Sequence, residues 1–346
     1  STLYAGLGLQ VIALLALTQL DPEWAIGASV VFVMLVQGAS GVAKDLAKMS
    51  SKSAVKLLAP AGHIGLFRWV ALLTGSKNMV KGFGFLLGAA LLATIGFTGA
   101  VLGMATVLAV ILIAVLVLMP AGLPKGNPGA KFTEVFSMSP NVNWLSAARV
   151  VLFGARDVWF VVGIPIYFYA ILSDGTEEGN RTSFFLIGTF MAIWVILYGL
   201  VQINAPRILN AKSRTTAELI SVTRLWAWAL TLVPGVLAVA ALLANGPQHW
   251  LTLGLVLGLL LFGALFAINS SLHSFLILLF TKAERVTRDV GFYYMANAAG
   301  RLIGTLASGL TYHIGGLPLM LAIAASMVAL SAMAVSFLVP EEETMG

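Results

Sequence analysis

The stretch "LFGARDVWFVVGIPIYFYAIL", Leu152–Leu172, decides the class of fold. It is apolar and long enough for a membrane helix, because a hydrocarbon core of about 30 Å takes about 20 helical residues. Yet Arg156 and Asp157 stand next to each other within it. Charged side chains at membrane depth are costly and usually face a protein interior or a water-filled path. The stretch therefore predicts a membrane helix whose charged side chains face the bundle interior or a water-filled path.

The composition of the whole chain agrees with a membrane protein. Of its 346 residues, 59% are hydrophobic and only 10% are charged, and the mean hydropathy is +0.96. Ordinary soluble domains carry about 25% charged residues, so a soluble fold could not cover this much apolar surface. The chain has no cysteine, which excludes disulfides and thiolate metal sites, and its four histidines show no metal-ligand spacing. We expect no cofactor and no metal.

We predict an all-α polytopic membrane protein with ten transmembrane helices. Clusters of Gly, Pro, Asn and charged residues separate the apolar segments, as connections should. The predicted spans are approximately 1–20, 24–46, 67–96, 98–119, 145–172, 182–204, 223–244, 249–275, 289–312 and 317–339.

Basic residues alternate between successive loops. The loops of one set hold Lys44, Lys48, Lys52 and Lys56; Lys125 and Lys131; Arg207, Lys212, Arg214 and Arg224; and Lys282, Arg285 and Arg288. The loops of the other set hold Arg181 among several acids. Since Lys and Arg mark cytoplasmic loops, we expect the first set and both ends of the chain on the cytoplasmic side.

The longest connection divides the predicted helices into two groups. Residues 120–144 are rich in Gly, Pro and Lys and read as a cytoplasmic linker. It would join an N-terminal helical bundle, 1–119, to a C-terminal six-helix bundle with a short cytoplasmic tail, 145–346.

A weak internal repeat crosses this linker. Gly84 and Gly88 in "GFGFLLGAALL" correspond to Gly300 and Gly304 in "AGRLIGTLASGL". Small residues four apart let membrane helices pack closely. The spacing is common in any membrane helix, but if the two segments are equivalent, the protein has two halves of six helices. Two helices would then be expected before residue 1, in a parallel-repeat transporter architecture.

Six basic residues lie in or beside the predicted spans: Arg68, Lys77, Lys81, Arg149, Arg156 and Arg301. The intramembrane acid is Asp157, and Asp45 lies near a cytoplasmic helix end. A base that faces lipid at mid-bilayer costs about 2.5–3.5 kcal/mol, so we expect these side chains to face the bundle interior or water. Because so few acids cannot neutralise them, the missing partner is expected to be an anionic substrate. Arg offers a planar fork for phosphate or carboxylate, and Lys a mobile point charge.

The predicted substrate-binding residues are Lys77, Lys81, Arg149, Arg156, Asn297 and Arg301. Neighbouring helix positions point about 100° apart, so Arg156 and Asp157 are expected to address different partners rather than each other. Asp157 is expected to be a counter-ion that orients Arg301 or a lysine, with proton transport as a second possibility, and Asp45 is expected to pair with a base.

Simpler roles stay open for several of these residues. Arg149 and Arg68 lie near the cytoplasmic end and could snorkel to the surface. Asn297 could equally hold helices together. Asn269 and His273, in "FAINSSLHSFL", share a helix face and are weaker candidates for lining the path.

Four segments carry a family resemblance: "SGVAKDLAKMSSKSAVKLL", "RWVALLTGSKNMVKGFGFLLGAALL", "LSAARVVLFGARDVWFVVGIPIYF" and "GFYYMANAAGRLIGTLASGL". Together they resemble the organoarsenical efflux permeases, the ArsJ family of the major facilitator superfamily, over the whole chain. The resemblance implies twelve helices, of which the first two have no counterpart here. It also implies alternating-access export of 1-arseno-3-phosphoglycerate across a bacterial inner membrane. A glyceraldehyde-3-phosphate dehydrogenase would make this small anion from arsenate.

Other functions stay open. The chain could export another phosphorylated or carboxylated metabolite. A multidrug exporter would be expected to carry unpaired acids in its helices, whereas bases dominate here. A non-transporting membrane scaffold would not need buried cations. An enzyme is not expected, since no nucleophile–base pair, metal cluster or phosphate loop is recognisable. The expected partners are the anionic substrate and membrane lipid, without nucleic acid.

Overall fold

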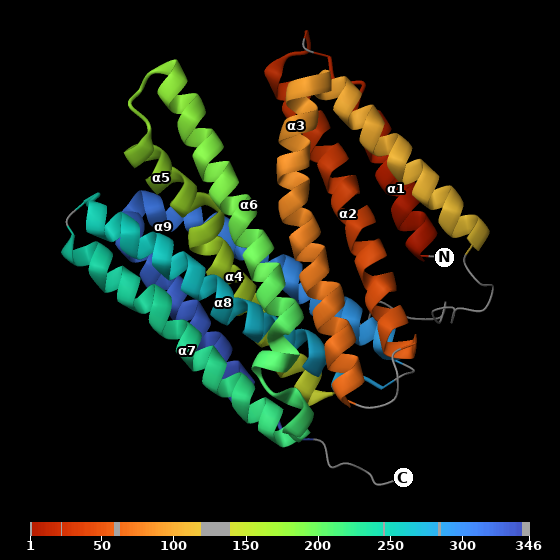
Figure 1. Cartoon of the computed structure of the whole chain (residues 1–346), viewed down its shortest axis with the longest axis vertical. Coiled ribbons are helices and arrows are strands. Elements are labelled where there is room, and N and C mark those ends of the chain that lie inside the picture. Colours follow the sequence, from red (N-terminus) through yellow and green to blue (C-terminus); the bar gives the residue numbers. More distant parts are fainter. Residues whose placement is uncertain are drawn as a thin grey trace. The chain divides into compact units, whose positions relative to one another are not determined.

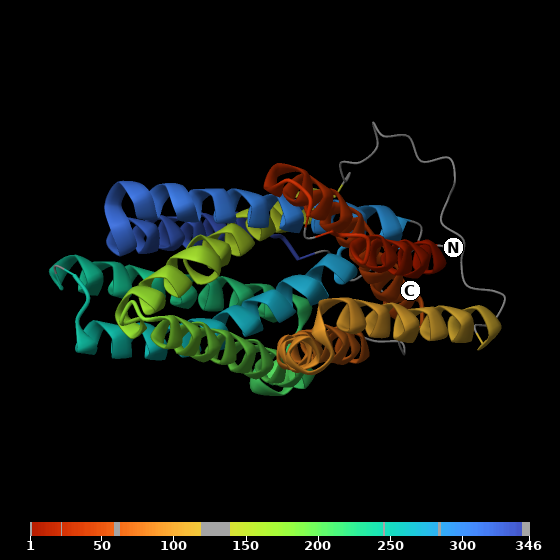
Figure 2. The same ribbon diagram turned by 90° about the horizontal axis from the view of Figure 1, so that it is seen from above.

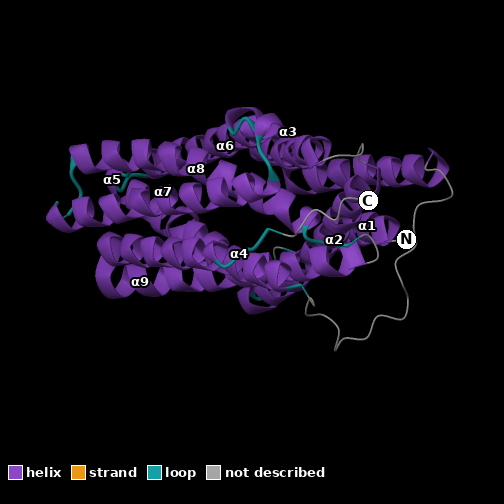
Figure 3. Ribbon diagram, turned by 90° about the horizontal axis from the view of Figure 1, so that it is seen from below, coloured by secondary structure: helices purple, strands orange, loops and turns teal. Residues whose placement is uncertain are grey.

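The structure is a computed structural model that describes residues 2–21, 23–58, 63–118, 139–244, 246–282 and 285–340. Within these residues all regular structure is helical (Figure 3). The helices, labelled in Figure 1, are α1 (Thr2–Leu17), α2 (Ile26–Leu58), α3 (His63–Leu118), α4 (Pro140–Asp157), η2 (Val158–Gly163), α5 (Ile164–Leu172), α6 (Glu177–Ile208), η3 (Ala211–Ser213), α7 (Thr216–Leu243), α8 (His249–Leu279) and α9 (Val286–Ser336).

Two long helices are each broken by glycine. In α3 the break is at Gly96, with φ 70°, and in α9 it is at Gly315 and Gly316, the latter with φ 62°. Glycine adopts positive φ without steric cost, so it can turn the chain inside an apolar run. Both breaks fall where the sequence predicted one span to end and the next to begin, at 96–98 and 312–317. Each helix therefore forms two segments.

The described helices account for the ten predicted spans. Helices α4, η2 and α5 follow one another without a gap and form one span, Pro140–Leu172. With α3 and α9 counted as two segments each, the described residues form ten long segments. Seven stretches of this part of the chain are long and apolar enough to cross a bilayer, the last of which holds both segments of α9.

By its internal packing the chain separates into two units. Unit 1 comprises Ser1–Leu58 and Gly84–Phe132, and unit 2 comprises Ala59–Phe83 and Thr133–Gly346. In unit 1, α1 and α2 pack closely. A Cβ on Gly6 would lie 2.8 Å from the carbonyl oxygen of Ala43.

Unit 2 contains α4 to α9 and the first part of α3. Helices α7 and α8 lie side by side in Figure 1, and α4 makes its most extensive contacts with α9. The two segments of α9 also lie side by side (Figure 2), with Ser308 Oγ 3.9 Å from Met320 Sδ. The second segment reaches α4 through Ser331, whose hydroxyl donates to the carbonyl oxygen of Ala148 at 2.9 Å. Helix α4 is thus held by both segments of α9.

Glycines allow α4 and the first segment of α9 to touch backbone to backbone. A Cβ on Gly300 would lie 2.1 Å from the carbonyl oxygen of Val150, and one on Gly304 would lie 2.3 Å from that of Gly154. Real Cβ atoms do not approach other atoms so closely, so these positions exclude any side chain. The close packing predicted for Gly300 and Gly304 is confirmed.

The proposed counterparts of these glycines behave differently. A Cβ on Gly84 or Gly88 would meet no described atom within 4 Å. The close glycine contact of α3 is instead made with α6, where a Cβ on Gly75 would lie 2.5 Å from the carbonyl oxygen of Gly199. The internal repeat therefore stays a prediction.

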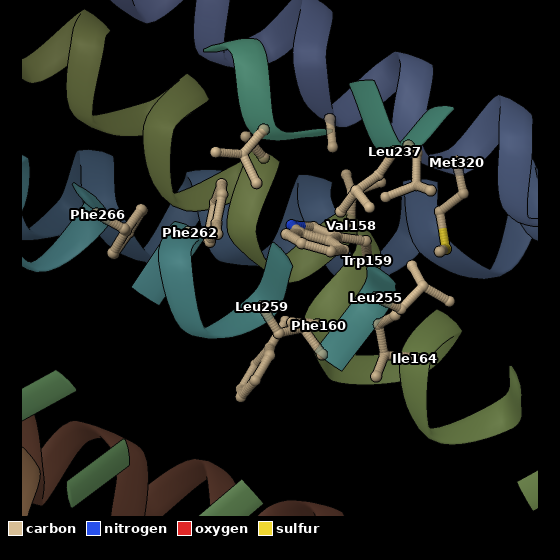
Figure 4. Close-up of a cluster of buried hydrophobic side chains, with 14 of the residues drawn as sticks. Val158, Trp159, Phe160, Ile164, Leu237, Leu255, Leu259, Phe262, Phe266 and Met320 are labelled. Atoms are coloured by element: carbon tan, nitrogen blue, oxygen red, sulfur yellow. The ribbon is translucent and has the colours of Figure 1, made fainter. Parts of the chain in front are cut away.

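An apolar core fixes the chain just beyond the charged pair. Trp159 is fully buried and packs edge-to-face on Phe262, with ring centroids 4.9 Å apart (Figure 4). Leu255 from α8 and Met320 from α9 belong to the same cluster. Buried aromatic rings contribute large apolar areas to such a core. The span that carries Arg156 and Asp157 is thus anchored against both α8 and α9.

The predicted linker is only partly described. Residues 119–138, with Lys125 and Lys131, lie outside the described residues, as does the tail 341–346. Helix α4 begins at Pro140, before the predicted start at residue 145, because Ser139 caps it by accepting a hydrogen bond from the backbone N–H of Val142 at 3.4 Å. The assignment of the residues to two bundles stays a prediction.

Candidate functional site

The crossing of α4 and α9 brings together five of the predicted site residues. Arg149, Arg156 and Asp157 lie on α4, and Asn297 and Arg301 lie on the first segment of α9. The glycine contacts of this crossing lie next to them: Val150 and Gly154 stand between Arg149 and Arg156, and Gly300 stands between Asn297 and Arg301. Because the backbones touch there, side chains from the two helices can reach one another directly.

Arg149 lies inside the bundle with neutral partners. It is 4% exposed. Its Nε donates to Asn297 Oδ1 at 3.1 Å, and its Nη1 donates to Ser270 Oγ of α8 at 3.2 Å. No carboxylate of the described residues lies within 4 Å of it. The alternative that Arg149 snorkels to the surface is wrong, because α8 and α9 cover it.

One carboxylate holds the other two arginines. Asp157 is 1% exposed, and its Oδ1 accepts from Arg156 Nε and Nη2 at 2.6 Å each. Its Oδ2 accepts from Arg301 Nε at 2.9 Å. The expectation that Arg156 and Asp157 address different partners is wrong for Arg156, because its long, flexible side chain bends back to its neighbour. Asp157 does also reach Arg301, one of the partners expected for it.

Aromatic rings line the arginine side of α4. The guanidinium carbon of Arg149 lies 3.8 Å from the ring centroid of Phe153, and that of Arg156 lies 4.7 Å from the same centroid. Tyr293 and Phe266 add a second ring to each, at 4.8 Å and 5.5 Å. Such contacts stabilise a cation by about 0.5–2 kcal/mol, more where water is absent. The sequence reading missed these rings, although Phe153 stands four and three positions from the two arginines.

The helix widens immediately after Asp157. From Val158 to Gly163 it is a π-helix, and at its end the N–H of Ile164 bonds to the carbonyl oxygen of Trp159. Pro165, in the following turn, has no N–H to offer a regular helical bond. Single π turns inside α-helices are frequent at functional sites. The widening changes the helical register between the charged pair and the rest of the span.

The remaining predicted residues lie elsewhere. Lys77 and Lys81 are on α3 and are exposed, as is Arg68. Asp45 belongs to α2 in unit 1 and pairs with Lys48 on the same helix at 2.6 Å. These residues are not part of the buried cluster.

The cluster has a polarity that could guide an anion. The described cluster holds three arginines, Arg149, Arg156 and Arg301, against the one carboxylate of Asp157, which pairs with the last two and leaves two positive charges in excess. Exposure falls along the series, since the side chain of Arg301 is 44% exposed, that of Arg156 is 16% exposed, and Arg149 is buried. An oxyanion entering at Arg301 would meet further guanidinium groups deeper in the bundle.

No protein-family model matches the sequence, and no curated protein matches it. Solved structures do match the fold. A bacterial homologue of the iron transporter ferroportin, in an outward-facing state, aligns with a TM-score of 0.72 at 14% identity and covers 97% of this chain and 82% of its own. The major facilitator superfamily transporter FucP, in the outward conformation, aligns with a TM-score of 0.68 at 12% identity, with 98% and 83% covered.

The human organic anion transporter MFSD10 (TETRAN) aligns with a TM-score of 0.67 at 14% identity, with 96% of this chain and 80% of its own covered. At sequence identities this low, the matches show a shared fold and nothing more. The chain has the major facilitator fold and is a multi-pass membrane protein. The predicted fold class is confirmed, and the narrower resemblance to organoarsenical permeases stays a hypothesis.

Proposed function

We propose that this protein is a membrane transporter that exports a small organic polyanion by alternating access. The observation that carries the proposal is the excess of positive charge in the buried arginine cluster. Leaving a charge buried without a partner costs several kcal/mol, which an anionic substrate would offset. The fold supplies the movement, because in transporters of this architecture two helical bundles rock about a central site.

A substrate anion would compete with Asp157 for Arg301. Asp157 contacts Arg301 through one nitrogen, Nε, and the Arg301 side chain is 44% exposed, which leaves its outer edge uncovered by the described residues. A phosphate-like group can approach that edge and take over the guanidinium in a two-pronged contact. Asp157 would then keep Arg156 in place while the anion moves toward Arg149. Asp157 thus holds Arg156 in place, and its contact with Arg301 is replaced by the substrate in each transport cycle.

The substrate we propose is 1-arseno-3-phosphoglycerate. Its identity rests on the family resemblance, and its charge suits the cluster, because it carries an arsenate ester and a phosphate. A glyceraldehyde-3-phosphate dehydrogenase would supply it on the cytoplasmic side of a bacterial inner membrane. The same cluster would accept another phosphorylated or carboxylated metabolite, which is the second candidate. Lys77 and Lys81 are proposed to line the path outside the buried cluster.

Everted membrane vesicles test the substrate. Vesicles that contain the protein receive radiolabelled arsenate and glyceraldehyde 3-phosphate, with and without the dehydrogenase. We expect accumulation of label only with the dehydrogenase, and loss of accumulation in Arg301→Ala. Arg207→Ala, at the exposed end of α6, is the matched control and should accumulate label normally. Accumulation without the dehydrogenase would contradict the arsenylated substrate, and normal accumulation by Arg301→Ala would contradict the arginine site.

A charge-balanced double variant tests how Asp157 acts. Asp157→Asn leaves Arg156 and Arg301 without their carboxylate and is expected to lower the free energy of unfolding by about 1–3 kcal/mol. The range is below that of fully buried ion pairs because Arg301 is partly exposed. Adding Arg301→Gln removes the repelling charge and should restore most of the stability. Transport should be lost in both variants.

Thermal unfolding in detergent measures these stabilities. Asp174→Asn, in the exposed loop before α6, serves as the control; it keeps the side-chain oxygen that accepts from Thr176, so stability and transport should change little. If the double variant is no more stable than Asp157→Asn, the contact between Asp157 and Arg301 does not balance charge in the way proposed.

A further inference from the structure

A buried histidine lies beside the arginine cluster. His273 on α8 is 0% exposed, and neither of its ring nitrogens has a hydrogen-bond partner among the described residues. Leaving a buried polar atom unsatisfied costs about 1–3 kcal/mol. Buried polar groups are normally paired, so an exception calls for a partner that is present in another state of the protein. For an imidazole, the simplest change is to bind a proton and to donate its N–H groups to water that enters when the site opens.

The position of His273 connects it to Arg149. Ser270, three residues earlier on α8, accepts a hydrogen bond from Arg149 Nη1 at 3.2 Å. Residues three apart share a helix face, so His273 lies on the face of α8 that meets the buried guanidinium. The positive charge of Arg149 therefore lies on the same side of α8 as the imidazole. While that charge is uncompensated, it opposes a second positive charge on the imidazole.

Other charged groups lie on the helices that pack against this part of α8. On α4, Arg156 and Asp157 are engaged with each other. On α7, Glu218 is held by Thr215 and Arg224 by the carbonyl oxygen of Leu338. The neighbouring elements also carry Arg68, Lys77 and Lys81 on α3, Tyr198 and Arg207 on α6, and Arg288, Asp289, Tyr293, Tyr294 and Arg301 on α9. Of these, Asp289 is buried, and its Oδ1 lies 3.9 Å from Arg285 Nε.

We infer that His273 is a proton-binding site coupled to anion binding at Arg149. The inference rests on the proposed function, since it requires that an anion reaches Arg149. Without an anion at Arg149 the imidazole is expected to be neutral, because it is fully buried and has no partner among the described residues for a second positive charge. When an oxyanion compensates Arg149, His273 takes up a proton from the buffered solution on its unprotonated ring nitrogen, and both N–H groups can then donate to the anion or to water. Asp157, which two arginines already engage, is less well placed to carry this proton.

The direction of the coupling follows from linkage. Because the anion favours the protonated imidazole, the proton must favour the bound anion by the same free energy. Anion affinity should therefore rise as the pH falls through the range in which histidine titrates. The transporter would move its anion together with a proton, which reduces the net charge carried.

Calorimetry on the purified protein in detergent tests this coupling with 3-phosphoglycerate as the probe. Binding is measured between about pH 5.5 and about pH 8 in buffers of different ionisation enthalpy, which reports the protons taken up per ligand. We expect the wild type to take up more protons than His273→Asn, by up to about one per ligand. Protons that 3-phosphoglycerate itself takes up or releases are the same for both proteins, so they cancel in the difference between them. His313→Asn, an exposed histidine of α9, is the control and should match the wild type.

The outcomes separate the two proposals. Equal proton uptake by the wild type and His273→Asn, with binding intact, overturns the role of His273 and leaves the anion site standing. Absence of any 3-phosphoglycerate binding by the wild type contradicts both.

A measurement on the wild-type sequence covers the case in which His273→Asn does not fold. Nitrogen NMR of ring-labelled histidine should show one histidine becoming protonated when 3-phosphoglycerate is added near neutral pH. Replacing the other three histidines one at a time identifies that signal by elimination. If no histidine signal changes, or if the changing signal belongs to one of those three, the inference is overturned.

Discussion

Replacing Arg149 by methionine is expected to reduce transport by about 100-fold or more while the protein still folds. Truncating a charged group that binds a desolvated anion typically costs about 2–5 kcal/mol, and each 1.4 kcal/mol is about a tenfold change. Arg149 is the deepest cation of the cluster and has no described carboxylate partner, so no protein charge is left unpaired when it is removed.

The expected stability of Arg149→Met follows from its surroundings. Replacing a buried charge by an apolar side chain of similar size is often neutral or stabilising. Methionine can fill the space between the rings of Phe153 and Tyr293, where sulfur–aromatic contacts are favourable. Asn297 and Ser270 each lose one donor, at a cost of about 1 kcal/mol per bond. The free energy of unfolding should therefore change by no more than about 2 kcal/mol.

Transport by Arg149→Met is measured in everted vesicles, and its stability by thermal unfolding in detergent. Arg207→Met, at the exposed end of α6, is the control and should leave both unchanged. Arg149→Lys keeps the charge but loses the planar fork, so it should transport weakly. Transport near the wild-type rate by Arg149→Met, at equal amounts of folded protein, would show that Arg149 has only a structural role.

The segments of the fold could be predicted because local chemistry decides them. Gly96 and Gly316 turn the chain at positive φ, and these turns lie where the sequence predicted breaks. Helix starts were harder to place. Ser139 and Pro140 form a regular N-cap and first turn of α4. In the sequence they stand among linker residues, so the cap could not be told from the linker before the helix was known.

The sequence predicted which residues belong to the candidate site better than it predicted which of them contact one another. Charges are so rare in the apolar spans that Arg149, Asp157 and Arg301 were conspicuous in the sequence. Their partners depend on which helix faces meet, and this is set by the glycine crossing of α4 and α9. For the same reason the sequence did not show that Ser270 would accept from Arg149, or that Arg156 would bend back to Asp157.

That crossing leads to the second large effect. Gly300→Val is expected to destabilise the folded state strongly. The added Cβ would lie 2.1 Å from the carbonyl oxygen of Val150 and 2.8 Å from its Cα. These are backbone atoms, so no side-chain rotation can relieve the clash, and the two helices must separate. We expect a loss of about 3 kcal/mol or more, against a total stability of about 5–15 kcal/mol.

Separation of the helices would also dismantle the site. Asn297 and Arg301 flank Gly300 on α9, and their contacts with Arg149 and Asp157 require the short distance between the backbones. Even Gly300→Ala adds the clashing Cβ, so it should be clearly less stable than the wild type. The yield of monodisperse protein after detergent extraction and its unfolding temperature measure both variants.

Two other glycines make the test specific. Gly309 lies on the same segment of α9, and a Cβ there would meet no described atom within 4 Å, so Gly309→Val should be tolerated. Equal damage from Gly300→Val and Gly309→Val would show that general helix propensity, rather than the crossing, is responsible. The internal repeat predicts that Gly84 is as intolerant as Gly300. Since a Cβ on Gly84 also meets no described atom within 4 Å, we expect Gly84→Val in this chain to resemble Gly309→Val.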